Sequence, residues 1–344
     1  MSLRILKKEG LGRFIDSLIK DFEVFGPVPK DGKTAFQKAG SFADITLEYT
    51  NTLLPPKKFL LPQEEVLFTY TLGDTPVMTA NIEKPARVVF GARSCDLHGI
   101  NLLDDIFAEG SPDAHYFSRR KGTFFIGLDC KEPCYPNSFC KDMGTLKPGG
   151  GYDLFFTDMG DVYGVEVGSK AGIAMLEYGE FHYPAYRQKD LFLDVWRKKL
   201  SDFPNLLGYD VTRLPVLLAD AYDDPLWDAL EERCFDCGAC TVVCPTCYCF
   251  DVFDRNEADG VHGARCRRWD SCQLRSFALI ASGENMRGKR SDRLRHRLFR
   301  KGKYFKEWYD RFACVGCGRC GRACLVRIDV LEIFKHVGAR CPMR

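Results

Sequence analysis

The segment CFDCGACTVVCP, residues 234–245, recurs 80 residues further along the chain as CVGCGRCGRACL, residues 314–325. Each copy carries three cysteines at intervals of three residues and a fourth cysteine four positions later. Three thiolates on one tight turn match three corners of an iron–sulfur cube, and this spacing is the ligand pattern of two-cluster ferredoxins. The repeat therefore predicts a pair of 4Fe-4S clusters in the C-terminal third.

The fourth cysteine of each copy is expected to ligate the cluster of the other copy, as in two-cluster ferredoxins. The predicted ligand sets are Cys234, Cys237, Cys240 and Cys324 for cluster 1, and Cys314, Cys317, Cys320 and Cys244 for cluster 2. Crossing the fourth ligand holds the clusters close together, as rapid electron tunnelling requires. The alternative is a structural zinc site, because paired Cys-x2-Cys elements also bind zinc. A third evenly spaced cysteine in both copies favours iron.

The composition narrows the class of protein. The chain has 344 residues, enough for two domains, and its formal net charge of +2 indicates neither nucleic acid nor membrane binding. Its 17 cysteines accompany no secretory signal and no apolar run of about 20 residues. Because a reducing cytoplasm does not sustain disulfides, we expect a cytoplasmic protein whose cysteines serve metal or redox chemistry.

The first 220 or so residues read as α/β. Buried strands are predicted at 87–90 and 123–128, and a helix opens between them at Asp96. This strand–helix–strand order predicts a partly parallel sheet. The segments 153–157 and 162–167 resemble the two strands of a hairpin.

A loop at Asp223, Asp224 and Pro225 is the predicted domain boundary, and helix-forming sequence resumes at 226–233. We expect an α/β or α+β domain over residues 1–224, followed by a mostly α-helical dicluster ferredoxin domain over residues 225–344. The segments between the two cysteine motifs look charged and helix-compatible, with little strand character. The motifs also lie too far apart for the compact, β-containing bacterial ferredoxin.

Eight further cysteines fall into two groups. The N-terminal group follows two predicted strands, at the carboxyl ends where open α/β sheets build their sites, and its thiolates are predicted to hold a third cluster. Its members are Cys95, Cys130, Cys134 and Cys140. The second group either ligates another cluster or packs beside the first two, and comprises Cys247, Cys249, Cys266 and Cys272. The alternative for the N-terminal group is ordinary buried thiols, and Cys341 has no assigned role.

A basic stretch and a set of glycines are the two other patterns in the C-terminal third. The stretch 287–311 is strongly basic, and either docks an acidic partner, offsets the charge of thiolate-bound clusters, or forms a solvated helical face. Gly316, Gly318 and Gly321 match a dinucleotide-binding fingerprint, but no strand precedes them and cysteines intervene. These glycines more plausibly let the backbone wrap a cluster.

The chain resembles the beta subunits of cytoplasmic sulfhydrogenases, a family that includes the corresponding iron–sulfur subunit of anaerobic sulfite reductase and related subunits of flavin oxidoreductases. The motifs that carry the resemblance are CPTCYC at 244–249, RWDSC at 268–272, the 293–300 stretch, CVGCGRC at 314–320, PPKKF at 55–59, FGARSCD at 90–96 and Ser138-Phe-Cys140. They cover nearly the full length. Two positions depart from the family pattern. Leu325 replaces a proline, and Ser138 replaces a cysteine for which Cys134 offers a nearby substitute.

The resemblance implies a hetero-oligomeric relay. Such proteins pass electrons between a subunit that binds flavin and NAD(P)H and a catalytic partner, which is a nickel–iron hydrogenase or a sirohaem sulfite reductase. The resemblance implies no substrate chemistry in this chain. It also implies that flavin is bound by a partner subunit. Two alternatives stay open: an oxidoreductase with its own flavin or substrate site in the N-terminal domain, and a zinc-binding interaction module.

Overall fold

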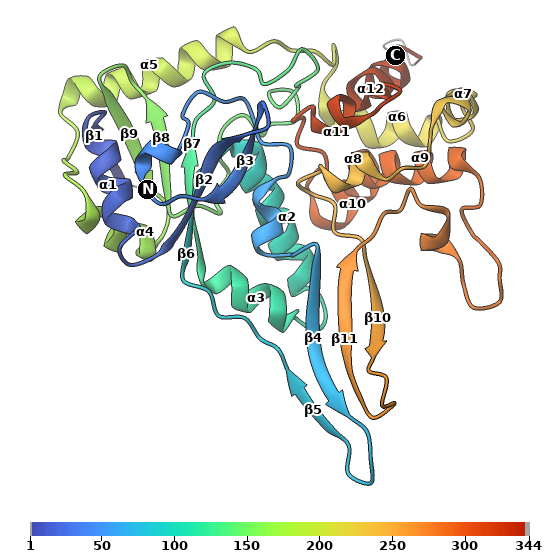
Figure 1. Ribbon diagram of the computed structural model, residues 1–344. Helices are drawn as coiled ribbons and strands as arrows, with labels where there is room; N and C mark the ends of the chain where they lie inside the picture. Colours follow the sequence, from blue (N-terminus) through green and yellow to red (C-terminus); the bar gives the residue numbers. More distant parts are fainter. Residues whose placement is uncertain (1, 341–344) are drawn as a thin grey trace.

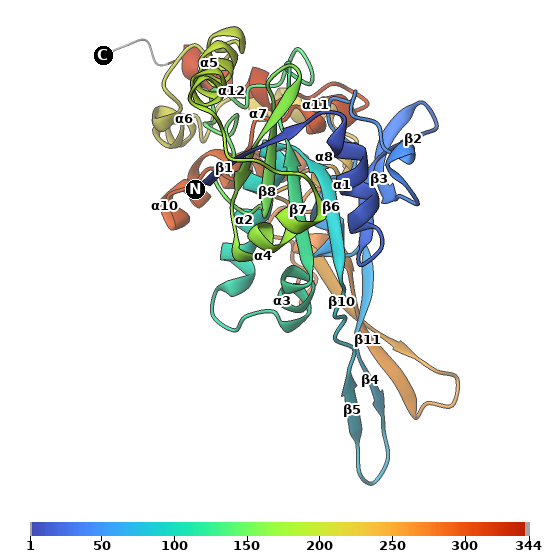
Figure 2. The same cartoon turned by 90° about the vertical axis from the view of Figure 1, so that its left-hand side faces the viewer.

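The computed structural model describes residues 2–340, and Cys341 lies outside them. The described chain forms an α/β body, a β arm that projects from it, and a helical body that carries both cysteine motifs (Figure 1). The helical body lies beside the α/β body, and the arm emerges where the two meet, as the second view also shows (Figure 2).

The α/β body is built on a seven-stranded mixed sheet of order β1-β9-β8-β7-β6-β2-β3. Its central strands β2, β6, β7 and β8 run parallel, while β1, β9 and β3 pair antiparallel. The strands span β1 Ser2–Lys7, β2 Glu23–Lys30, β3 Lys33–Lys38, β6 Arg87–Ala92, β7 Thr123–Leu128, β8 Leu154–Asp158 and β9 Val162–Val167. The central strands are apolar runs because both faces of the sheet are covered.

Helices cover the two faces of this sheet. On one face α1 and α4 pack through Phe14, Leu18 and Met175 against Phe90 and Phe156. On the other face α2, α3 and α5 form a second apolar layer with the sheet. The helices span α1 Gly10–Leu18, α2 Ser94–Ala108, α3 Ala114–Lys121, α4 Lys170–Met175 and α5 Tyr186–Asp202. Such a three-layer body leaves the carboxyl ends of β6 and β7 free to carry loops with function.

The arm is a four-stranded antiparallel sheet of order β10-β11-β4-β5. It joins distant parts of the chain, because β4 and β5 come from the N-terminal part and β10 and β11 from the segment between the cysteine motifs (Figure 1). The strands span β4 Glu64–Thr71, β5 Val77–Ala80, β10 Phe250–Asn256 and β11 His262–Trp269. The arm therefore ties the two halves of the chain together.

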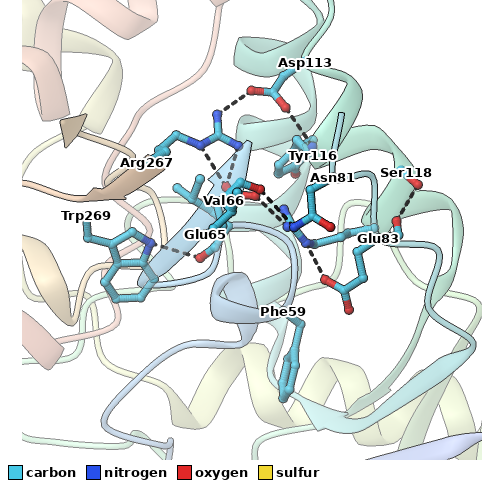
Figure 3. A network of polar contacts seen from close by, with 12 residues as sticks. Phe59, Glu65, Val66, Asn81, Glu83, Asp113, Tyr116, Ser118, Arg267 and Trp269 are labelled. Carbon is cyan, nitrogen blue, oxygen red and sulfur yellow. Dashed lines mark hydrogen bonds and ion pairs between the residues drawn. The ribbon is translucent and has the colours of Figure 1, made fainter. Parts of the chain in front are cut away.

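A buried ion network fixes the root of the arm to the α/β body (Figure 3). Glu65 of β4 accepts ion pairs from Arg119 of α3 at 2.5 Å and from Arg267 of β11 at 2.7 Å. Arg267 also pairs with Asp113, which caps the start of α3. All three residues of the Glu65 pairs are buried, so removal of one partner leaves an uncompensated charge, a loss of about 3–5 kcal/mol.

The helical body has its own apolar core, contributed by α6, α7, α9 and α12. Leu214, Leu218, Leu298 and Phe334 are its most enclosed members. The helices span α6 Leu214–Asp220, α7 Leu226–Arg233, α8 Ala239–Val242, α9 Arg290–Phe299, α10 Phe305–Tyr309, α11 Arg319–Ala323 and α12 Val330–Ala339. A π-helical turn, Arg300–Tyr304, joins α9 to α10. Within residues 2–340, no helix has both the length and the apolarity to span a bilayer.

Most predicted elements are confirmed. The parallel pair β6–β7, helix α2 between them and the hairpin β8–β9 lie where the sequence indicated, and a helical region follows the α/β body. The expectation of little strand character between the two motifs is wrong, because β10 and β11 lie there and find their partner in β4. Their pattern was not recognised because charged residues alternate along an exposed arm. The boundary near 224 stays a prediction, and α6 packs in the C-terminal core from the other side of it.

Candidate iron–sulfur centres

The two cysteine motifs share one backbone conformation. Gly238 and Gly318, which follow the second cysteine of each copy, have φ of 71° and 74° and precede the short helices α8 and α11. Two residues after the first cysteine, Asp236 and Gly316 have φ of 57° and 64°. Left-handed residues at matching places turn the backbone twice, so three cysteines face one space. The left-handed conformation of Gly316 and Gly318 agrees with the wrapping that the sequence predicted.

The first cavity contains the four cysteines predicted for cluster 1. Cys234, Cys237 and Cys240 line it from the first motif, and Cys324 lines it from the second. Burial raises the pKa of Cys240 to about 12 despite the nearby Arg297 guanidinium. The Ile328 amide donates to Cys324 Sγ at 3.3 Å. Cys237 is exposed, so this cavity lies at the molecular surface.

The second cavity contains the four cysteines predicted for cluster 2. Cys314, Cys317 and Cys320 line it from the second motif, and Cys244 lines it from the first. Burial raises the pKa of Cys317 to about 11 and also raises that of Cys314. The structure thus brings together both crossed sets that the sequence predicted.

Three buried cations, Arg297, Lys301 and Lys57, surround these cysteines. Arg297 lines both cavities, and Lys301 lines the second. Lys301 Nζ donates to Thr246 Oγ1 at 2.6 Å, and Lys57 Nζ donates to the Cys247 carbonyl at 2.7 Å. Within residues 2–340, none of the three forms an ion pair with a carboxylate, and Arg297 Nε lacks a hydrogen-bond partner. Buried charge without a counter-charge is costly, so these cations fit sites that hold anionic, thiolate-bound clusters.

The nearby thiolates raise the pKa values of Arg297 and Lys301, whereas burial lowers the pKa of Lys57 to about 8. Burial disfavours the charged form of Lys301, but the Cys244 and Cys247 thiolates outweigh it and raise the lysine pKa. Arg293, Arg297 and Lys301 are spaced four residues apart and are all buried, so this face of the basic stretch points inward. Its neighbours Lys289 and Arg290 are exposed. The basic stretch is therefore exposed at its start and buried at Arg293, Arg297 and Lys301.

The N-terminal cysteines lie near one another. A hydrogen bond from the Cys134 thiol lowers the pKa of Cys130 to about 6. Burial, together with the Cys130 and Cys317 thiolates, raises the pKa of Cys140 to about 12. Burial and the negative charge of Asp96 raise the pKa of Cys95. The Cys317 and Cys130 thiolates raise it further. The four thiols thus lie near one another and near Cys317 of the second motif.

Arginines link this N-terminal group to its surroundings. Arg319 of α11 forms a buried ion pair with Asp96 at 2.8 Å and donates to Cys95 Sγ at 3.9 Å. Arg93 donates to the carbonyls of Thr50 at 3.0 Å and Leu128 at 3.2 Å. Sequence reasoning missed Arg319 as a site residue. The available signal was its place between Gly318 and Cys320, where the first motif has Ala239.

Ser138, the departure from the family pattern, contacts the second motif. Its hydroxyl accepts from the Tyr135 amide at 3.1 Å and donates to the Cys317 carbonyl at 3.4 Å. It is buried, and the thiol beside Cys130 is that of Cys134. Cys134, which the sequence offers as a substitute for the missing cysteine, thus lies beside Cys130.

A third cavity collects most of the second group of cysteines. Cys247, Cys249 and Cys272 line it. The Cys272 thiol donates a hydrogen bond that lowers the pKa of Cys249. Cys266 is buried on β11 and does not line this cavity. Among the described residues, no three His, Cys, Asp or Glu side chains gather closely enough for a single metal ion.

Comparisons with known proteins agree with this geometry. Residues 233–328 match the family of the 4Fe-4S dicluster domain. The chain is similar to sulfhydrogenase 2 subunit beta of Pyrococcus furiosus, with 33% identity over 344 aligned residues that cover 96% of this chain and 97% of the relative.

The chain belongs to the sulfhydrogenase beta-subunit family. The family resemblance drawn from the motifs is thus confirmed, as are an α/β N-terminal part and a helical part with a 4Fe-4S dicluster domain. Membership supports an iron–sulfur electron-transfer subunit of the ferredoxin type. No solved structure matches the chain.

Proposed function

We propose that this sulfhydrogenase beta-subunit homologue is a cytoplasmic relay in a hetero-oligomeric oxidoreductase. Its partners in this proposal are a catalytic subunit, such as a hydrogenase, and a subunit that binds flavin and NAD(P)H. The name of the relative supports assembly with other subunits, and reduced thiols suit the cytoplasm. The proposal involves neither nucleic acid nor membrane, and no substrate is transformed by this chain.

The crossed ligand sets form the centre of the proposal. Cluster 1 would be held by Cys234, Cys237, Cys240 and Cys324, and cluster 2 by Cys314, Cys317, Cys320 and Cys244, because each set lines one cavity. When bound, such clusters accept and release single electrons. The supporting observation is Arg297, a buried cation against both cavities with no carboxylate partner. Its charge stabilises the reduced, more negative state and so raises the potential.

The N-terminal cysteines extend this relay. We propose a third cluster held by Cys95, Cys130, Cys134 and Cys140, whose thiols influence one another. Cys317 neighbours both Cys95 and Cys140, so the third site would adjoin cluster 2. The three sites then form a row from the α/β body to exposed Cys237. This row suits an electron path that enters through one partner and leaves to another.

Anaerobic metal analysis tests the proposal. The three ligand sets of this proposal account for about twelve irons and as much sulfide per chain, with four irons for each set. Cys324→Ser and Cys237→Ser come from different motifs, yet both are expected to abolish the same electron paramagnetic resonance (EPR) signal. Cys244→Ser is expected to abolish the other one. If Cys324→Ser instead abolished the signal that Cys317→Ser removes, the crossing would be wrong, and zinc without sulfide would refute the relay.

A cavity in the α/β body favours a second candidate function. It measures about 640 Å³, lies at the carboxyl ends of β6 and β7, and is lined by Cys130, Arg93, Lys8 and Lys131. Such a cavity suits an oxidoreductase that binds its own flavin or substrate. Isolated protein that retains flavin, or that oxidises NAD(P)H with a dye as acceptor, would favour this function. Isolated protein that only exchanges electrons with a reduced flavoprotein would favour the relay.

A further inference from the structure

The third cavity lies apart from the two cavities that contain the crossed cysteine sets. It measures about 410 Å³ and lies between the root of the arm and helix α9. The pairing of Phe250 with Trp269 aligns β10 with β11, and the Asp270 amide donates to the Cys249 carbonyl at 2.9 Å. This pairing brings Cys249 beside Cys272, which follows β11 by three residues. Cys247 enters the same space from the loop after the first motif.

The lining of this cavity selects an anion. Its charged residues are cationic, and no aspartate or glutamate is among the lining residues. Arg297 is buried, and its Nε finds no partner among residues 2–340. Arg287 Nε is likewise buried without a partner. Two N–H donors without acceptors beside three thiols match the sulfide and thiolate sulfurs of a cluster better than they match a neutral ligand.

We propose that Cys247, Cys249 and Cys272 hold an additional 4Fe-4S cluster whose fourth iron has no cysteine ligand from this chain. The inference rests on the proposed function for the presence of the neighbouring clusters. No fourth cysteine lines the cavity, and Cys266 faces elsewhere on β11. His296 is the one imidazole among the lining residues, so it is the side chain available to the fourth iron.

A cluster at this site would add a second electron-transfer route to the relay. The Cys247 thiol lies within hydrogen-bonding reach of Cys244, a predicted ligand of cluster 2. Arg297 lines all three C-terminal cavities, so its charge acts on each site. A cluster next to cluster 2 but outside the row toward Cys237 gives electrons a second exit. That exit lies at the root of the arm.

Iron content tests the site directly. Cys272→Ser is expected to lose about four irons and four sulfides per chain relative to the unaltered protein, by the four-iron arithmetic of one cluster. Cys266→Ser is the matched control, because it alters another buried cysteine of the same region and is expected to lose none. The EPR signals of clusters 1 and 2 are expected to persist in both variants. Equal iron in Cys272→Ser and unaltered protein would overturn the inference and leave the relay intact.

A second measurement applies even where a variant folds poorly. In the unaltered protein, mild oxidation with ferricyanide is expected to release one Fe²⁺ from the three-cysteine cluster. A [4Fe-4S]²⁺ cluster then gives Fe²⁺, one electron to ferricyanide and a [3Fe-4S]⁺ cluster with its own EPR signal. Cys266→Ser is expected to yield the same signal, and His296→Ala to yield it faster. Absence of any three-iron signal, or one zinc per chain in place of the iron, would overturn the inference.

Discussion

The two cysteine motifs have the same spacing and backbone turns but very different surroundings. Around the first motif, Cys237 is exposed, and so are Phe235 at 64% and Leu325 at 79%. The second motif is covered by the α/β body, where the Phe139 amide donates to the Gly316 carbonyl at 2.8 Å. The Thr145 hydroxyl donates to the Val315 carbonyl at 2.7 Å. The same spacing thus occurs in one motif that is open to solvent and in one that the α/β body covers, and tertiary packing makes this difference.

The largest expected effect comes from Arg319→Ala, which gives the second motif the alanine of the first. The change leaves Asp96 buried without its partner, so we expect a loss of about 3–5 kcal/mol in the free energy of unfolding. Anaerobic thermal unfolding of iron-loaded protein measures it. Arg322→Ala, on the same helix but exposed, is the control; it loses only a hydrogen bond and a ring contact to Tyr135 and is expected to cost about 1 kcal/mol. Equal effects would mean that the interface is not what distinguishes the motifs.

The next effect separates two glycines of like conformation. Gly316→Ala would bring its Cβ within 2.6 Å of the Phe139–Cys140 backbone, whereas Gly238→Ala would meet only the Ser271 side chain at 3.1 Å. Both changes carry left-handed strain of about 1–2 kcal/mol. Only Gly316→Ala adds a backbone clash, worth about 1–3 kcal/mol more. Chemical denaturation should rank Gly316→Ala as the less stable variant, and the reverse order would contradict the packing described here.

Arg297→Met tests what both motifs share. Removal of this cation should lower the potentials of both clusters, on the order of 60 mV each, one tenfold step for a one-electron couple. Anaerobic redox titration followed by EPR measures the shift. Arg295→Met is the control, since Arg295 pairs with Asp292 at 2.9 Å and lines none of the three C-terminal cavities. A shift confined to one cluster would show that the cation belongs to that cluster alone.

The smallest effect is expected at Leu325. It follows the fourth cysteine of the second motif, at the position where the first motif has Pro245. The side chain is exposed and no ligand depends on it, so Leu325→Ser should retain all iron. Stability should change by less than about 0.5 kcal/mol. Metal analysis and thermal unfolding check both points. Loss of cluster 1 in this variant would mean that the exposed wall of the first cavity contributes to cluster retention.

Several features of the fold could be predicted because they depend on local patterns. Strand β7 and helix α7 were predicted with the bounds that the structure has, since apolar runs and helix signals are local. The arm was not predicted, because β10 and β11 gain their stability from β4, which lies about 200 residues away in the sequence. Alternating charge on exposed strands carries little of the hydrophobic signal that identifies a strand.

The sequence by itself determined the spacing of the thiols, the glycines that turn around them, and hence the kind of cofactor and the family. Ligand spacing is a local property that a few residues encode. Only the tertiary structure decided that Arg297 and Lys301 turn inward, that Arg319 reaches Asp96, and that Cys249 meets Cys272 in a third cavity. These contacts join residues from different elements, and which elements pack together depends on burial of the whole apolar core.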